Sequence, residues 1–264
     1  MTTLSYAVAD SATMLRRNLK RMQRYPAMTV MIIMVPVVFL LLFVYVFGGT
    51  LGAGLGHLGD GRAAYLRYVT PGIVLLTLGT AATSTAVSVA MDMSSGIIAR
   101  FRTMAIARVS VLTGHVLGSM ILSLLGIAFV IGIAVAMGFR TSADPLSWLA
   151  VAGLLLLITF AITWLAVALG LVSGSAETAS NLPMFLMLLP FLGSGFVPTR
   201  TMPVGLRWFA EYQPFTPVIQ TVRGLLADGP IGNNAIMAIG WGAGIAALSY
   251  LWARRLYRRP MQAK

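Results

Sequence analysis

Very few side chains in this sequence have a type and spacing that could do chemistry. The two histidines, His57 and His115, lie far apart and lack metal-ligand spacing, so we expect no metal site and treat His115 as a surface or packing residue. A serine nucleophile could be sought at Gly193-Ser194-Gly195, but no convincing histidine partner accompanies it, and small residues in a kinked helix explain it better. The absence of cysteine excludes thiol chemistry and disulfides. No catalytic residue is predicted.

The sequence also lacks a loop that could hold nucleotide phosphates. The motif GxxxxGK, followed by serine or threonine, needs a lysine after a glycine, and the only lysines are Lys20 and Lys264. We therefore expect no cofactor in this chain and no ATPase activity of its own. If its work is driven by ATP, a separate ATPase chain must bind the ATP and Mg²⁺.

Composition indicates which elements must carry the function instead. Hydrophobic residues make up 58% of the 264 residues and charged residues only 10%, against about 25% charged in ordinary domains. Several apolar runs reach the length of about 20 residues that a helix needs to cross a membrane. The chain is predicted to be an all-α polytopic membrane protein with one transmembrane domain over residues 1–264. Six spans are expected, at residues 27–47, 68–91, 109–137, 146–172, 181–197 and 234–253.

Three of these spans have distinctive features. Pro36 predicts a kink in the first span, and the glycine-rich residues 48–67 that follow are expected to form an external loop. The fifth span is short and interrupted by prolines and glycines. The second span carries a stripe of small residues suited to close helix packing: Gly79, Ala82, Ala86 and Ala90.

Two segments outside the spans also have helical patterns. Residues 3–24 carry apolar residues on one face and a basic cluster on the others, which indicates either an amphipathic helix lying on the membrane or a charged lead-in. Residues 198–230 are neither a clean span nor a clean loop. Within them, residues 204–212 and 218–226 are predicted to be short amphipathic helices, separated by Pro214 and Pro217.

The basic residues predict the orientation of the spans. Placing both termini, residues 92–108 and residues 173–180 on the inner side puts thirteen of the nineteen lysines and arginines there, and six outside. This distribution follows the positive-inside rule with an even number of spans, and it makes both termini cytoplasmic. Because the basic residues cluster at the ends of apolar runs, we do not expect a nucleic-acid partner, but membrane lipids are expected to contact them.

Residues 92–108 form a basic, polar segment between the second and third spans. A short amphipathic helix is predicted here, because three apolar residues recur at helical spacing: Ile97, Phe101 and Met104. One interpretation is a solvated turn whose arginines obey the positive-inside rule. The other is a docking element that presents an apolar ridge to a cytosolic partner.

Three features of the chain resemble a known family. These are the basic amphipathic segment before the first span, the pattern in residues 92–108, and the segment 191–226. The second reads Asp92-x-x-x-Gly96-x-x-x-Arg100-Phe101-Arg102-Thr103, and the third contains Pro198…Met202-Pro203…Gln213-Pro214-x-Thr216-Pro217…Arg223. Together they are similar to the permease subunit of ABC-2 type exporters, and within these to the daunorubicin-resistance (DrrB-like) branch of actinobacteria.

The resemblance implies a fold and an assembly. The fold would be that of ABC-2, or type V, exporters: six transmembrane helices, an N-terminal interface helix (3–24), a short cytosolic coupling helix (92–108) and external re-entrant helices (198–230). Two permeases, either identical or a related pair, would assemble with two ATPase subunits. The re-entrant motif would comprise Pro198, Pro203, Pro214, Pro217 and Arg223.

The resemblance also implies roles for particular residues. Ile97, Phe101 and Met104 would be the apolar knobs that enter a groove of the ATPase, while Arg100 and Arg102 would pair with its acidic residues or with lipid phosphates. A substrate path would form at the interface between two permeases. Aromatic and methionine side chains of the first and fifth spans would line it: Phe39, Phe43, Met184, Phe185, Met187 and Phe191.

The function implied is that of the permease of an ATP-driven exporter in the bacterial cell membrane. It would move hydrophobic or amphiphilic compounds, such as drugs, antibiotics or lipids, from the cytoplasm or inner leaflet outward. Export of lipid or glycan carriers is an alternative. An ion-coupled secondary transporter is disfavoured because no ionisable residue falls clearly in the middle of a span. An intramembrane enzyme is disfavoured by the missing nucleophile and base, and an assembly or immunity factor is the remaining alternative.

Overall fold

The computed structural model describes residues 13, 15–17, 20, 24, 26–55, 61–95 and 108–258. Over these residues the regular structure is entirely helical, with no strand. The helices follow one another in the order α2 (Pro26–Leu41), η1 (Leu42–Val46), α3 (Gly48–Ala53), α4 (Gly61–Ser94), α6 (Arg108–Ala136), α7 (Pro145–Val172), α8 (Ala176–Asn181), α9 (Met184–Leu188), η2 (Thr199–Thr201), α10 (Val204–Tyr212), α11 (Phe215–Ala227) and α12 (Asn234–Arg258).

Within this part of the chain, four helices are long and apolar enough to cross a membrane. They are α4, α6, α7 and α12, and the stretch Ile32–Val46 of α2 and η1 is a shorter apolar helix. The predicted all-helical, multi-pass architecture is therefore confirmed, and the four long helices correspond to the second, third, fourth and sixth predicted spans. The fifth predicted span, 181–197, is not a continuous helix. Its first residue belongs to α8, residues 184–188 form α9, and the rest consists of turns and a bend.

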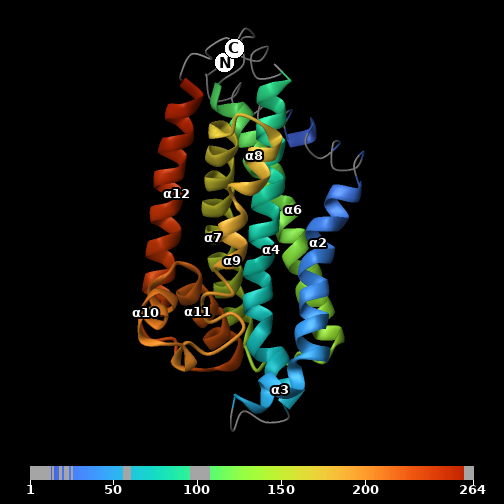
Figure 1. Cartoon of the computed structure of the whole chain (residues 1–264), viewed down its shortest axis with the longest axis vertical. Helices are drawn as coiled ribbons and strands as arrows, with labels where there is room; N and C mark the ends of the chain where they lie inside the picture. Colours follow the sequence, from blue (N-terminus) through green and yellow to red (C-terminus); the bar gives the residue numbers. More distant parts are fainter. Residues whose placement is uncertain are drawn as a thin grey trace.

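α4 is the central helix of the bundle (Figure 1). In the most apolar stretch of α4, 78% of the residues are buried, and in that of α7 67% are buried. The corresponding shares are only 33% in α6 and 22% in α12. α6 and α12 therefore lie at the periphery, where most of their side chains face outward. α4 begins at Gly61, so the expectation of a loop over residues 48–67 is wrong. α3 occupies the start of that range and packs against α4.

The stripe of small residues allows other elements to approach α4 closely, as its pattern predicted. A Cβ placed on Gly79 would lie 2.9 Å from the Cγ of Met187 in α9, so a larger residue would displace α9. Ala86 and Ala90 form a small cluster with Ala179 of α8. Both α8 and α9 therefore pack against α4 along this stripe, as Figure 1 shows.

α2 contains a proline, and the backbone carbonyl that this proline leaves without its helical donor faces α4. Pro36 has no N–H, so the carbonyl of Ile32 one turn earlier loses its helical donor. The hydroxyl of Thr80 in α4 lies 3.4 Å from that oxygen and 2.8 Å from the carbonyl oxygen of Thr77, so it can donate to either one. α2 continues as an α-helix through Pro36 to Leu41, so the kink at this residue stays a prediction. The helix widens into the π-helical turn η1 only after Leu41.

The short helices lie at opposite ends of the bundle. α3, α10 and α11 gather at one end, and α8 lies toward the other, beside α4 (Figure 1). α10 spans Val204–Tyr212, as the sequence predicted. α11 begins at Phe215, three residues before the predicted start, because Pro217 falls in the first turn, where a helix does not need its N–H.

Candidate functional site

The broken segment that follows α9 takes its hydrogen bonds from α11 and the residues just before it. Its turns run over residues 189–196 and leave backbone groups without helical partners. The side-chain amide of Gln213 donates to the carbonyl of Leu189 over 3.2 Å. The hydroxyl oxygen of Thr216 accepts from the N–H of Ser194 over 3.1 Å. The motif Gln213-Pro214-x-Thr216 thus supplies the polar groups that irregular backbone needs inside an apolar bundle.

Arg223 joins α11 to two other elements. Its Nη2 donates to the carbonyl of Ser194 over 2.8 Å and to the carbonyl of Tyr68 in α4 over 2.9 Å. Its guanidinium carbon lies 3.7 Å from the ring centre of Tyr68, which is a cation–π contact. Its Nη1 also donates to the side chain of Gln220 over 3.1 Å. A guanidinium can make all these contacts at once because its donors form a rigid planar fork.

The four prolines of the same motif begin helices. Pro198 and Pro203 precede η2 and α10. Pro214 precedes α11, and Pro217 lies in its first turn. Proline suits these positions because its fixed φ matches a helix start and no donor is lost there. The prolines therefore set where each short helix begins, while Gln213, Thr216 and Arg223 make the contacts.

The broken segment also touches α4 through its backbone. A Cβ on Gly72 would lie 2.6 Å from the carbonyl oxygen of Gly195, so only glycine fits at this crossing. Next to it, the Tyr65 hydroxyl donates to the carbonyl of Phe196 over 3.1 Å. Tyr65 is fully buried. The position of this segment on α4 is therefore fixed by close backbone packing as well as by hydrogen bonds.

Three of the predicted substrate-path residues meet in one aromatic cluster. The ring centres of Phe39 and Phe191 are 5.7 Å apart, and those of Phe43 and Phe191 are 6.2 Å apart. Phe196, which the sequence did not single out, stacks on Phe191 at 4.2 Å and lies 4.5 Å from Phe43. We call Phe39, Phe43, Phe191 and Phe196 the phenylalanine cluster. It connects α2 and η1 to the broken segment.

The other three predicted path residues lie elsewhere. Met187 is partly buried and packs against Gly79 of α4. Met184 and Phe185 point out of the bundle, with 56% and 47% of their surfaces exposed. The structure thus separates the predicted set into an inner group beside α2 and an outward face on α9.

The five predicted coupling residues fall outside the described part of the chain: Ile97, Arg100, Phe101, Arg102 and Met104. The structure does show the ends of that connection. Asp92 and Ser94 belong to the last turn of α4, and α6 begins at Arg108. The segment predicted over residues 92–108 is therefore shorter at both ends than the sequence indicated.

The described side chains do not form a catalytic or metal-binding arrangement. Among them, no group of three histidine, aspartate or glutamate residues could hold a metal ion. The buried hydroxyl of Ser194 has no hydrogen-bond partner among the described residues, so none of these residues is placed to activate it as a nucleophile. Ser194 contributes through its backbone N–H and carbonyl instead.

Comparisons with known proteins agree with this architecture. The daunorubicin resistance ABC transporter permease protein DrrB1 of Streptomyces coeruleorubidus is 26% identical over 96% of this chain and 87% of its own length. The probable doxorubicin resistance ABC transporter permease protein DrrC of Mycobacterium tuberculosis is 25% identical over 74% of this chain and 70% of its own. The putative transport permease ycf38 of Porphyra purpurea is 26% identical over 89% of this chain and 80% of its own length.

The family comparison covers the elements described above. The model of the ABC-2 type transporter family matches residues 11–227, which run from the N-terminal segment to the end of α11. This range includes the phenylalanine cluster, the broken segment and Arg223. With its multi-pass helical bundle and its similarity to drug-resistance permeases, the chain belongs to the ABC-2 type transporter family.

Proposed function

We propose that this chain is the membrane permease of an ATP-driven exporter, that it carries hydrophobic or amphiphilic compounds outward, and that it is not itself an enzyme. The observation that carries the proposal is the similarity to a daunorubicin resistance permease over 96% of the chain. Two relatives are named for resistance to amphiphilic drugs, which favours a drug over the alternative cargo, a lipid or glycan carrier. An ion-coupled secondary transporter has no support from these relatives.

The proposed topology has six crossings with both termini in the cytoplasm of a bacterial cell. The chain would cross as α2 with η1, then as α4, α6 and α7, then as α8 and α9 with the broken segment, and last as α12. The positive-inside rule supports the orientation, because this topology would put thirteen of the nineteen basic residues on the cytoplasmic side. In this arrangement α10 and α11 are the external re-entrant helices.

The phenylalanine cluster is the proposed lining of the substrate path. Beside it, α2 and η1 expose apolar side chains, of which Val46 is 64% and Tyr45 53% exposed. Met184 and Phe185 extend this outward apolar surface on α9. A second copy of the permease, or a related one, would cover it. A path between two such faces suits amphiphiles, because aromatic and methionine side chains adapt to varied apolar shapes.

The proposed motor is a pair of separate ATPase subunits that bind ATP and Mg²⁺. Each would receive the connection between α4 and α6 in a groove, with Ile97, Phe101 and Met104 as apolar knobs. Arg100 and Arg102 would pair with acidic residues of the ATPase or with lipid phosphates. Because α4 is the central helix, movement of its end would reach the helices packed around it.

Co-purification of the permease with its ATPase tests the docking part of this proposal. Phe101→Asp places a charge among the apolar knobs, so at least a tenfold loss of bound ATPase is expected, with normal insertion in the membrane. Val204→Asp is the matched control. Val204 is 87% exposed at the opposite end of the bundle, so its substitution should leave ATPase binding unchanged. Equal ATPase binding by Phe101→Asp and wild type would refute docking through this segment.

A further inference from the structure

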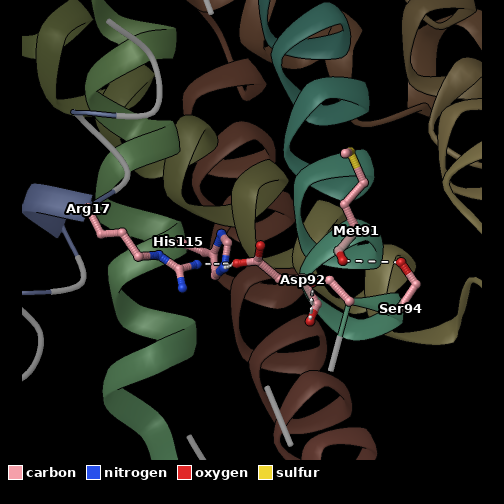
Figure 2. A network of polar contacts seen from close by, with 6 residues as sticks. Arg17, Met91, Asp92, Ser94 and His115 are labelled. Carbon is pink, nitrogen blue, oxygen red and sulfur yellow. Dashed lines mark hydrogen bonds and ion pairs between the residues drawn. The ribbon is translucent and has the colours of Figure 1, made fainter. Parts of the chain in front are cut away.

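A buried carboxylate lies at the end of α4. Asp92, in the last turn, is only 5% exposed. Its Oδ2 accepts a hydrogen bond from Nε2 of His115 in α6 over 3.1 Å, and it forms an ion pair with the guanidinium of Arg17. Figure 2 shows both side chains pointing at the carboxylate from different elements. Three segments that are distant in sequence therefore meet at one oxygen atom.

The carboxylate of Asp92 is buried, so its contacts with Arg17 and His115 are needed to balance its charge. A buried charge is tolerated when it is paired and hydrogen-bonded, and removing one partner leaves an uncompensated charge. The imidazole of His115 is even more buried than the carboxylate, with 4% of its side chain exposed against 7% for Asp92. Arg17 is partly buried, whereas its neighbour Arg16 is exposed. The N-terminal segment thus contacts the bundle at Arg17 through a specific charge pair.

Asp92 lies close to the connection between α4 and α6, on which the proposed ATPase would act. α4 ends two residues later at Ser94, and α6 begins at Arg108. The connection that would dock on the ATPase therefore starts two residues after Asp92 and finishes about two helical turns before His115. The hydroxyl of Ser94 donates to the carbonyl of Met91, which closes the last turn of α4 next to the carboxylate (Figure 2).

We propose that Asp92 is a positioning residue that ties the N-terminal segment, α4 and α6 into one unit at the inner end. This inference rests on the proposed function. A displacement of the connection between α4 and α6 then moves all three segments together, because the pairs Arg17–Asp92 and His115–Asp92 prevent them from separating. Without the carboxylate, ATP hydrolysis continues but is converted into transport less efficiently.

The first test needs neither ATPase nor substrate. Because the chain has no cysteine, a spin label on Arg16→Cys reports only on the N-terminal segment. We expect Asp92→Asn to increase the label's mobility clearly, because Arg17 loses its charged partner. The control is Glu177→Gln, which removes an exposed carboxylate from the same end of the bundle. Unchanged mobility in Asp92→Asn would overturn the proposed tie.

The second test measures coupling in liposomes that contain permease and ATPase. Daunorubicin moved per ATP hydrolysed should fall at least fivefold in Asp92→Asn and in Arg17→Asp, and should be retained in Asp92→Glu and in Arg16→Asp. If the variants only lowered the amount of assembled complex, with a normal ratio per complex, the residue would be merely structural and the inference would fail.

The two proposals fail in different ways. If wild-type liposomes show no ATP-dependent transport, the proposed function is wrong, and the spin-label result still decides whether the tie exists. If wild type transports and Asp92→Asn has the same ratio, only the tie is wrong. Should Asp92→Asn not fold, Arg17→Ala takes its place, because it leaves the buried Asp92–His115 hydrogen bond intact.

Discussion

At the scale of single residues, Arg223 holds together the end of the bundle that carries α10 and α11. Replacing it with alanine would remove the buried donor of the Ser194 carbonyl, which lies in the broken segment, and a second hydrogen bond to the carbonyl of Tyr68 in α4. We expect Arg223→Ala to lower the free energy of unfolding by about 3 kcal/mol, measured by denaturant titration in detergent. Arg223→Lys should recover only part of this, because a lysine cannot reproduce the planar fork.

Arg207 offers a control for that experiment. It pairs with Glu211 one turn later in α10, over 2.7 Å, and half of its side chain is exposed. Such surface pairs contribute little, so Arg207→Ala should change the free energy of unfolding by about 0.5 kcal/mol or less. An equal loss in both variants would mean that Arg223 acts through general surface charge and not through its buried hydrogen bonds.

The residue scale also shows what the sequence could and could not reveal. The family pattern pointed to Arg223, but its partners are backbone carbonyls, which every residue has and which leave no signature in a sequence. Phe196 was missed because an isolated phenylalanine after Gly195 has no distinguishing spacing. Asp92 and His115 are 23 positions apart, and His115 was expected to be a surface or packing residue, so only the fold reveals their contact.

At the scale of elements, the crossing of α4 and the broken segment depends on the absence of side chains. Gly72→Ala would drive a methyl group against the backbone of Gly195. We expect this to lower the free energy of unfolding by about 2 kcal/mol and to disturb the contacts of Arg223. Gly153→Ala, in α7, meets open space and should be neutral or stabilising by up to about 1 kcal/mol. Tolerance of Gly72→Ala would contradict the close crossing.

The start of α7 should make stability depend on pH. Asp144 caps this helix, with its Oδ1 accepting from the N–H of Ser147 over 2.7 Å. Hydrogen bonds from Ser147 hold the pKa of Asp144 below its usual range. Because the folded pKa is lower than the unfolded value of about 3.9, the contribution is complete above that value and is lost as the pH falls through the folded pKa.

The variant Asp144→Asn isolates that contribution. Asparagine caps a helix about as well as aspartate but does not titrate in this range. The difference in unfolding midpoint between wild type and variant should stay constant from neutral pH to about pH 4.5. Below that, it should shift in favour of the variant. A difference that does not change with pH would show that the charged form of Asp144 has no special role in the cap.

Element boundaries show where sequence patterns were sufficient. The long apolar runs and the amphipathic pattern of α10 were predicted, because local periodicity determines them. The start of α4 was missed, since Gly61, Arg62 and Arg67 made this region look like a loop. In the structure, α3 packs against these turns and Arg62 lies over the ring of Tyr45, with its guanidinium carbon 5.3 Å from the ring centre. Tertiary contacts, which sequence periodicity does not record, therefore extended the helix.

At the scale of the whole molecule, the bundle is asymmetric in a way that fits the proposed exporter. One end carries Asp92, His115 and the two helix ends beside the proposed docking connection, and the other carries Arg223 and the short helices α10 and α11 (Figure 1). α4 runs between these two ends and contacts the elements at both. A displacement at the end that carries Asp92 would therefore reach the broken segment and the phenylalanine cluster through a single helix.

The most direct test of this account is drug uptake by inverted membrane vesicles that contain the permease and its ATPase. We predict that daunorubicin accumulates inside the vesicles only when ATP is hydrolysed, that Phe101→Asp abolishes the accumulation, and that an ionophore which dissipates the proton gradient leaves it unchanged. Accumulation that proceeds without ATP and collapses when the gradient is removed would contradict the account and would identify an ion-coupled carrier instead.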